Sequence, residues 1–508
     1  KVLVFSDSRQ VAARLAPNLQ MYSTRDSLRP LIVWGYKKLQ AAPIVTPRLS
    51  LDDLYLAVLL GSKQLGVRLR PGLKTAENYE AESAVEAAIQ SGEVNTDTGL
   101  LDLLLALRSE SPPQALLDDI VTTVQDPFLG LEALALASIA ERGNRAAALA
   151  KLPNIPAIAE TPQTKLELVR AWLRCWRANQ GFWLDKMPDA WCHTNVRCKK
   201  GKGKFDAMDE VLTDKAARKI FNDNWTPELL RTFTTDMGGE WRLKGSELTL
   251  HFDGEWVRCP SCKSVHRPVS TIPHCLDCGS REVSPLDPSR DPVFLARKGY
   301  YRNSVMAALG TPPQEPMALI AAEHTAQLNS PQNEDVFSKA ELNELLFQDI
   351  APAWGPKALR ESAIDVLSST TTMEVGIDIG ALSGVALRNM PPGRANYQQR
   401  AGRAGRRGNA VATVVAFGSA DSHDEHYFSE PDGMITGKVV DPKLTLDNKE
   451  ITKRHVRAFL LQNYHQDRIR EVDPAQPHDL FSVLGSVAGF RTGKAVLNIK
   501  DFAQWLAD

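Results

Sequence analysis

The chain has 508 residues, of which 43% are hydrophobic and 24% are charged, and its formal net charge is -1. This composition is ordinary for a globular protein with about two to four domains, and no apolar run approaches the ~18 residues of a membrane span, so a transmembrane helix is not expected. Because the charge is balanced overall, any binding of nucleic acid has to come from local basic surfaces.

The first residues predict a strand that leads into a helix. Residues 2–5, V-L-V-F, form an apolar run, residues 6–10, S-D-S-R-Q, form a polar turn, and residues 11–16 begin a helix. Strand, turn and helix start in this order are typical of an α/β unit. Because the chain opens at Lys1 directly on the strand, we expect a further part of the protein upstream.

A mostly helical region with loops rich in proline and glycine is predicted from about residue 25 to about residue 235. The alanine- and leucine-rich stretch 131–152 predicts one helix, residues 161–183 a second with Pro162 in its first turn, and residues 209–225 and 226–233 two more. No period of 20–50 residues repeats, which argues against a solenoid. We interpret the region as a helical insertion that folds outside a sheet.

Two features of this region allow two interpretations each. Residues 197–204, R-C-K-K-G-K-G-K, contain five cations that either grip a DNA backbone or form a solvated loop. Four tryptophans stand at near-helical spacing, which favours a hydrophobic core over base stacking. They are Trp172, Trp176, Trp183 and Trp191.

Four cysteines follow the helical region in two C-x2-C pairs. Cys259 and Cys262 are separated by twelve residues from Cys275 and Cys278, and glycine follows the last cysteine. This pattern predicts four thiolates around a structural Zn²⁺, with no coordination position left for water. Alternating residues at 241–243, 248–252 and 256–258 predict the hairpins of a zinc ribbon. Two disulfides or free buried cysteines are the alternative, which the reducing cytoplasm expected for this chain disfavours.

Strands of a parallel sheet are predicted again after residue 300. Apolar runs lie at 317–320, 364–367, 384–387 and 411–417, and helical patterns separate them. That alternation is typical of a parallel α/β sheet, and we expect the last run to be a buried closing strand. Beyond the sheet, residues 444–464 predict a helix and the remainder an α-rich extension.

An arginine ladder occupies residues 397–408, Y-Q-Q-R-A-G-R-A-G-R-R-G. Arg400, Arg403 and Arg406 stand three residues apart and therefore on one face of a helical turn. From Arg388 to Gly408 there are six arginines and no acidic residue, so we expect a ligand to supply the negative charge. Guanidinium forks suit phosphate oxygens, whereas the alternative is a solvated basic face.

Four segments together resemble superfamily 2 helicases and translocases. Residues 371–379 fit T-T-x-E-x-G-I-D-I of motif V, residues 399–406 fit Q-R-x-G-R-x-G-R of motif VI, and residues 5–10 resemble motif IV. A fourth segment, A-E-H-T-A-Q-L at 322–328, resembles the stretch between motifs IV and V. The resemblance covers about residues 1–20 and 315–465.

Within the superfamily, the resemblance is strongest to a bacterial and eukaryotic subgroup. Its members carry, or pair with, a cysteine-containing C-terminal domain of unknown function. The subgroup includes the large helicase subunit of the DISARM anti-phage system, and the long segment between motifs IV and V favours that type.

The resemblance implies a role for each matched residue. Arg403 and Arg406 would reach the γ-phosphate of an ATP bound, with Mg²⁺, mainly by a first motor domain. Gln399 and Arg400 would position the triphosphate, and Gly376 and Asp378 would couple the nucleotide to the strand end. A further set would contact the backbone of single-stranded DNA. Its members are Ser6, Ser8, Arg9, Thr325, Thr370 and Thr371.

The phosphate-binding loop of a first motor domain, GxxxxGK[ST], does not occur in the 508 residues. Residues 66–75 have the wrong spacing, and the acidic triplet at 424–426 follows motif VI without a preceding strand, so we assign both to loops. We therefore expect a second motor domain that does not hydrolyse ATP alone. Its expected partners are an upstream first motor domain, DNA and a companion subunit with the cysteine-containing domain.

The predicted fold is α/β: a RecA-like parallel sheet with a helical insertion, a zinc ribbon and an α-rich C-terminal extension. The predicted boundaries are 1–24 for the start of the motor domain, 25–238 for the insertion, 239–290 for the zinc ribbon, 291–422 for the rest of the motor domain and 423–508 for the extension. Two other functions remain open. One is a nucleic-acid-binding scaffold that has lost hydrolysis, and the other is a zinc-ribbon module that binds another protein.

Overall fold

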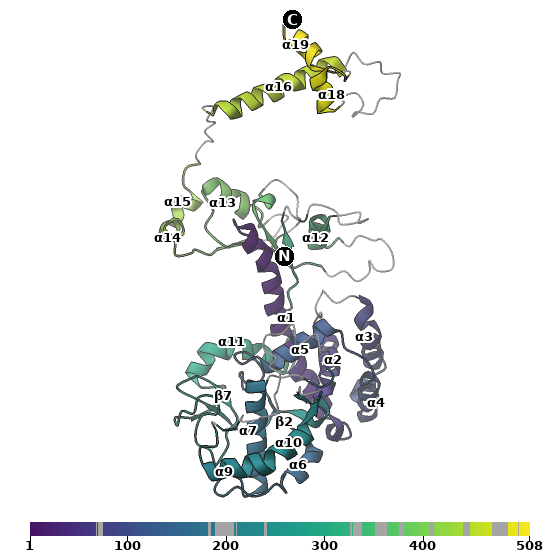
Figure 1. Ribbon diagram of the computed structural model, residues 1–508, viewed down its shortest axis with the longest axis vertical. Helices are drawn as coiled ribbons and strands as arrows, with labels where there is room; N and C mark the ends of the chain where they lie inside the picture. Colours follow the sequence, from purple (N-terminus) through teal and green to yellow (C-terminus); the bar gives the residue numbers. More distant parts are fainter. Residues whose placement is uncertain are drawn as a thin grey trace. The chain divides into compact units, whose positions relative to one another are not determined.

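The computed structural model describes two compact units, Lys1–Gly437 and Lys438–Asp508 (Figure 1). The described residues are 1–67, 69, 75–180, 184–187, 208–209, 211–237, 241–325, 328, 338–350, 363–374, 380, 382–405, 411–439, 448–469, 486–495 and 497–507. No helix within these ranges is both long enough and apolar enough to span a membrane.

A five-stranded parallel sheet organises the first unit. Its strand order is β12-β11-β1-β10-β9, so chain segments more than 300 residues apart lie next to each other. The predicted parallel sheet is therefore confirmed. The strands are β1 Val2–Phe5, β9 Ala321–His324, β10 Val366–Ser369, β11 Gly384–Leu387 and β12 Thr413–Ala416.

Helices lie on both faces of this sheet. On one face, α1 (Arg9–Gln40) packs along β9 and β10, and the Ser368 hydroxyl donates to the Ala12 carbonyl at 3.0 Å. On the other face, Phe347 of α12 (Lys339–Phe347) and Tyr397 of α13 (Arg394–Ala401) pack in the core that contains Leu3 and Phe5. Side chains alternate between the faces of a strand, so β1 contributes to both layers.

Strand β12 is an edge strand, and the expectation of a buried closing strand is wrong. Val414 and Ala416 pack against the sheet core, but Val411, Val415 and Phe417 are exposed. An apolar run shows only that a strand has hydrophobic faces. Which face is covered depends on the helices that pack on it, and these come from elsewhere in the chain.

Helix α1 continues from the sheet into the helical insertion. Its buried residues change from Ala12 and Ala16 beside the sheet to the stretch from Leu28 to Leu39 in the insertion core. The boundary placed at residues 24 and 25 therefore falls inside one uninterrupted helix. Figure 1 shows this helix entering the helical region.

Helices α1 and α2 (Leu54–Gln64) cross at glycines. A Cβ on Gly35 would stand 1.9 Å from the carbonyl oxygen of Ala57, and a Cβ on Gly61 would stand 2.7 Å from that of Leu31. The backbones therefore approach more closely than any residue with a side chain permits. This contact fixes how α1 enters the insertion.

The insertion is mostly helical, and its core also includes a later helix. Trp172 and Trp176 of α7 are buried in it, as predicted, while Trp183 and Trp191 lie outside the described residues. Val305 and Ala308 pack in the same core, so the helix after the cysteines belongs to it as well. The α-helices are α2, α3 Thr75–Gln90, α4 Asp97–Leu107, α5 Gln114–Gln125, α6 Gly143–Leu149, α7 Pro162–Gln180, α9 Lys215–Ile220, α10 Thr226–Phe233 and α11 Pro292–Ala308. Short helical turns cover Thr46–Arg48, Leu51–Asp53, Glu93–Asn95, Phe221–Trp225 and Gly245–Glu247.

The helix predicted over residues 131–152 does not form. Ala135 has a left-handed φ of 52°, strand β2 (Ser138–Glu141) follows, and only α6 is helical. β2 pairs with β5 (Leu248–His251), and Lys298 and Arg302 donate to the carbonyls of residues 133–135. These distant partners outweigh the local helix propensity, which amounts to less than about 1 kcal/mol per residue. Similarly, the helix predicted over 209–225 begins only at α9 and ends in a π-helical turn.

The cysteines lie in the loops of a small sheet of order β7-β6-β8, formed by Trp256–Arg258 (β6), Val265–His266 (β7) and Ser284–Leu286 (β8). The two other strands predicted to form its hairpins pair elsewhere. β4 (Trp241–Leu243) pairs with β3 (Thr234–Asp236), and β5 pairs with β2. The sheet beside the cysteines is therefore smaller than the predicted ribbon, because β4 and β5 pair with β3 and β2 instead.

The second unit contains α16 (Lys449–Ile469), α18 (Val487–Thr492) and α19 (Ile499–Ala507). Helices α14 (Ser422–Ser429) and α15 (Pro431–Ile435) belong to the first unit, so the boundary at residue 423 is too early. The acidic triplet at 424–426 lies in α14, so its assignment to a loop is wrong. Asp424 is buried and accepts from the Ser419 backbone N–H at 2.8 Å.

Candidate active site and metal centre

The segments that resemble helicase motifs meet at one edge of the sheet. The register places His324, Ser369, Phe5, Leu387 and Ala416 side by side at the carboxyl ends of the five strands. In parallel sheets, functional residues gather at this edge because all strands end there. Ser6, Thr325 and Thr370 each directly follow one of these strands, so the three residues lie at neighbouring positions along this edge.

Arg400 joins three of these segments. Its side chain is fully buried, Nε donates to Glu374 at 2.5 Å, and Nη2 donates to Asp7. Its guanidinium also lies over the Phe5 ring, 5.5 Å from the centroid. The expectation that a ligand supplies the negative charge is therefore wrong for Arg400. The chain supplies it from two residues outside the arginine ladder.

Glu374 is the common acceptor at this point. Besides Arg400, its carboxylate accepts from the Asn396 side chain at 3.1 Å, and its main-chain carbonyl accepts from Arg403 Nη2 at 2.7 Å. Arg403 is buried as well. Glu374 thus holds two of the three ladder arginines, one through its side chain and one through its backbone.

Asp7 is fixed from the neighbouring strand. Its backbone N–H donates to the Asn389 side chain at 3.3 Å, and the Asn389 amide donates to the Asp7 carboxylate. Because Asn389 follows β11, this contact closes a network across β1, β10 and β11. Four residues of this network were not predicted as site residues: Asp7, Glu374, Asn389 and Asn396. Asp7 and Glu374 stand in the quoted motifs, and an acidic residue in a motif that pairs with an arginine-rich motif is the signal that could have identified them.

The remaining nucleotide-site residues are only partly placed. Gln399 is exposed on α13, whereas Gly376, Asp378 and Arg406 lie outside the described residues. The structure therefore brings Arg400 and Arg403 together and leaves Gln399 on the surface beside them.

The six residues predicted to contact DNA divide into two groups. Ser8, Arg9 and Thr371 are exposed. Ser6, Thr325 and Thr370 are buried, and the Thr325 hydroxyl donates to Glu323 at 2.7 Å. Ser8 caps α1 by accepting from the Val11 N–H at 3.4 Å. In this conformation, among these six residues only the exposed group has side chains that a DNA strand could contact.

A buried histidine supports the turn after β10. His324 Nε2 lies 2.6 Å from Glu344 Oε1, and its Nδ1 lies 3.5 Å from the Thr372 hydroxyl. Thr372 belongs to the 3₁₀ turn Thr371–Met373 that leads directly to Glu374. His324 thus connects α12 to the segment that holds the arginines, a role that sequence reasoning did not assign.

The four cysteines lie close together, as the C-x2-C spacing predicted, and form a second candidate site. Their sulfur atoms all lie within 4.8 Å of one another, with Cys259 and Cys278 at 3.6 Å and Cys262 and Cys275 at 3.7 Å. Both separations exceed the ~2.05 Å of a disulfide bond, so the disulfide alternative is wrong. They match the roughly 3.8 Å between ligands of a tetrahedral zinc with ~2.3 Å bonds. Four thiolates at these distances fit a zinc ion.

The two cysteine pairs adopt the same backbone turn. Lys263 N–H donates to the Cys259 carbonyl and Gly279 N–H to the Cys275 carbonyl, both at 3.0 Å. Lys263 and Gly279 both have left-handed φ values, 63° and 68°. Glycine adopts that conformation without strain, which explains its place directly after Cys278.

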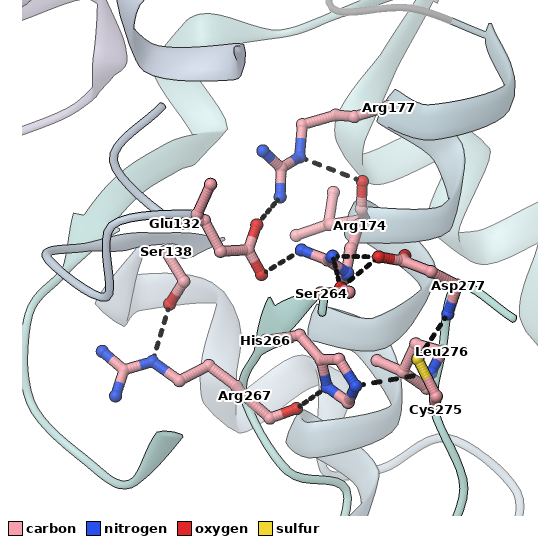
Figure 2. A network of polar contacts seen from close by, with 12 residues as sticks. Glu132, Ser138, Arg174, Arg177, Ser264, His266, Arg267, Cys275, Leu276 and Asp277 are labelled. Atoms are coloured by element: carbon pink, nitrogen blue, oxygen red, sulfur yellow. Dashed lines mark hydrogen bonds and ion pairs between the residues drawn. The ribbon is translucent and has the colours of Figure 1, made fainter. Parts of the chain in front are cut away.

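A charged network joins the cysteines to α7 (Figure 2). Asp277 accepts from Arg174 at 2.7 Å and from Ser264, and its backbone N–H donates to the Cys275 sulfur at 3.4 Å. Glu132 accepts from Arg174 at 2.7 Å and from Arg177 at 2.6 Å. Burial disfavours the Glu132 carboxylate, but these two arginines reverse the effect and lower its pKa. Glu132, Arg174 and Arg177 of this network line a cavity of about 280 Å³.

The histidines near the cysteines are not ligands. His266 is buried, accepts from the Leu276 N–H at 3.4 Å and contacts the Arg267 carbonyl at 2.8 Å through Nδ1 (Figure 2). His274 contacts the Val211 carbonyl at 3.1 Å. Cys175 is buried in α7, and burial raises the pKa of its thiol to about 12. The basic stretch 197–204 lies outside the described residues.

Comparisons with known proteins match this chain to one helicase family and to two proteins. Residues 356–408 match the family described as helicase conserved C-terminal domain. The chain is 38% identical over 287 residues to the Druantia protein DruE of Escherichia coli (strain UMEA 4076-1), covering 55% of this chain and 15% of that protein. It is 36% identical over 108 residues to the ATP-dependent helicase HRQ1 of Saccharomyces cerevisiae (strain ATCC 204508 / S288c), covering 20% of this chain and 10% of that protein.

The chain thus spans only 15% and 10% of the length of these two relatives. No solved structure matches it significantly. The matched region includes α13 and the arginine ladder, and it lies on a five-stranded parallel sheet flanked by helices. This part of the chain is therefore similar to the C-terminal domain of superfamily 2 helicases and has a RecA-like α/β fold.

Proposed function

We propose that the chain is the C-terminal part of an ATP-dependent superfamily 2 DNA helicase or translocase that acts on single-stranded or unwinding DNA. One observation carries the proposal: Arg403 is anchored through the carbonyl of Glu374, which Arg400 holds in place. A buried arginine fixed at the carboxyl edge of a parallel sheet is pre-organised to stabilise charge with little reorganisation.

In this proposal the nucleotide is bound mainly by a first motor domain, with Mg²⁺. Arg403 and Arg406 reach across to the γ-phosphate, a contribution on the order of 10³–10⁵ in rate for such arginines. Gln399, Gly376 and Asp378 contact the nucleotide. Arg400 does not contact it but positions Glu374 and, through it, Arg403.

Single-stranded DNA crosses the same sheet edge near β9, β10 and β1. Ser8, Arg9 and Thr371 contact its phosphates, and Ser6, Thr325 and Thr370 contribute when the two motor domains close. Contacts to the backbone alone carry no sequence information, which suits a motor that moves along DNA.

The cysteines hold a structural zinc ion in this proposal. Cys259, Cys262, Cys275 and Cys278 are its ligands, and the ion stabilises the fold around them. A companion subunit with the cysteine-containing C-terminal domain, a cytoplasmic location and a role in bacterial anti-phage defence follow from the subgroup resemblance. The DISARM type is part of the same proposal and rests on the long segment between motifs IV and V.

The test is DNA-stimulated ATPase activity of the protein with both motor domains. Arg403→Gln is compared with Arg290→Gln, which removes an exposed arginine between β8 and α11. We expect Arg403→Gln to lower kcat by about 10³ or more while the KM for ATP changes little, because the contribution belongs to the transition state. Equal activity of both variants would overturn the role proposed for Arg403, whereas a parent protein without DNA-stimulated turnover would be a scaffold without hydrolysis or a protein-binding module.

A further inference from the structure

Helix α16 carries an exposed basic stripe in its first half. The stripe consists of Lys449, Lys453, Arg454 and Arg457, all exposed. From residue 449 to residue 466 the only acidic residue is Glu450. Glu450 lies 3.0 Å from Lys453, but its side chain is 80% exposed, and an ion pair this solvated neutralises little.

The cations repeat along one side of the helix. Lys449, Lys453 and Arg457 stand four residues apart, so each follows the previous one by about 6 Å along the axis on the same side. Val456 and Phe459 border the stripe, and these residues are 50% and 62% exposed. A row of positive charge therefore runs beside an apolar and aromatic edge.

The core of the second unit does not use this half of the helix. Tyr464, in the other half, is fully buried and meets Phe490, Phe502 and Trp505 at 5.1–6.4 Å between ring centroids. Figure 1 shows α18 and α19 at that end of α16. Among the described residues of the unit, the aromatic cluster therefore leaves the basic stripe and its apolar border exposed to a partner.

We propose that the first half of α16 binds single-stranded nucleic acid, with the basic stripe on consecutive phosphates and Val456 and Phe459 against the bases. Arginine and lysine neutralise phosphates, and unstacked bases pack on aromatic side chains. The apolar border favours a single strand over a duplex, in which bases are stacked on one another. This inference rests on the proposed function for its choice of polyanion.

The first test is the salt dependence of binding to fluorescein-labelled dT20 by the complete protein. The variant Lys453→Gln/Arg454→Gln/Arg457→Gln removes three cations. Each phosphate contact on a single strand adds about 0.7 to the steepness of the plot of log K against log salt, so we expect this slope to become less steep by about 2. The control Lys215→Gln/Lys219→Gln/Lys339→Gln removes three exposed cations from α9 and α12 and should keep the slope. Equal slopes for the two triple variants would overturn the proposal.

The second test separates base contacts from charge. We expect Phe459→Ala to weaken binding by about 10-fold at high salt without changing the slope, because stacking does not release counterions. Unchanged affinity would overturn the base contact.

The same proteins are mixed with vesicles that contain phosphatidylserine. Binding of the parent protein to vesicles but not to dT20 would overturn the proposal in favour of a membrane surface.

These outcomes differ from failure of the proposed function. Arg403→Gln should lose ATP turnover and keep the full salt slope. The α16 triple variant should keep kcat and need more DNA for half-maximal stimulation. If the parent protein hydrolyses no ATP but the triple variant still loses about 2 in slope, the proposed function fails and the nucleic-acid surface stands.

Discussion

Replacing Arg400 by methionine removes the cation that joins three segments of the parallel sheet and keeps much of the apolar volume of the side chain. Glu374, whose side chain is 9% exposed, loses its ion pair inside the protein, whereas Asp7, at 34%, can be hydrated in part. Removing one partner of a buried ion pair costs about 3–5 kcal/mol. Because Asp7 regains water, we expect the lower limit, about 3 kcal/mol of unfolding free energy for the sheet.

Hydrogen exchange measures this change locally, which suits a chain with more than one unit. The amides of β1 and β10, including the Ser6 N–H bonded to the Ser369 carbonyl at 2.9 Å, should exchange about 100-fold faster, since each 1.4 kcal/mol is a factor of ten. Arg388→Met, at an exposed arginine after β11, is the matched control and should leave the rates unchanged.

The same experiment contains a rescue. Adding Glu374→Gln to Arg400→Met replaces the buried unpaired carboxylate with a neutral amide and should restore part of the protection. If Arg400→Met exchanges at the rate of Arg388→Met, the ion pairs do not stabilise the sheet. That result would contradict the assignment of Asp7 and Glu374 as the groups that neutralise Arg400.

Three further predictions concern the insertion and the cysteines. The pKa of Glu132 is lowered from 4.5 in the folded protein. Its ion pairs therefore contribute fully to stability above pH 4.5, and this contribution is lost as the pH falls through the lowered pKa. In Glu132→Gln the melting temperature should fall less steeply across that pH range. Gly35→Ala should lower the free energy of unfolding by about 1–3 kcal/mol or more, because its Cβ would overlap the Ala57 carbonyl. The control Gly143→Ala, whose Cβ would have no atom within 4 Å, should be neutral. Equal midpoints of the two variants in a denaturant titration would contradict the close crossing of α1 and α2. Elemental analysis should find about one zinc ion per chain in the parent protein and none in Cys275→Ser. The melting temperature of this variant should no longer respond to a chelator. Zinc retained in the variant would contradict the four-cysteine site.

Local sequence patterns predicted the features that depend on neighbouring residues. β11 forms at the predicted residues 384–387, and the two cysteine pairs meet at the separation that zinc requires. In both cases the determining pattern is short: an apolar run between turns, and a C-x2-C turn that repeats its own backbone geometry.

Features that depend on distant partners could not be predicted in this way. Arg400 is neutralised by Asp7, 393 residues away in the chain, so its own segment shows only unpaired positive charge. Residues 131–152 favour a helix locally, but pairing of β2 with β5 and the cations of α11 decide their fold. The exposure of β12 depends likewise on which strands α1 covers.

The central claim, that this chain supplies arginines to a nucleotide bound by another motor domain, is tested most directly by complementation. ATP turnover in the presence of single-stranded DNA is measured for the 508-residue chain alone and for the same chain together with its first motor domain. We predict no turnover for the chain alone and DNA-stimulated turnover for the pair. Turnover by the chain alone, or by the pair carrying Arg403→Gln at the parent rate, would contradict the account.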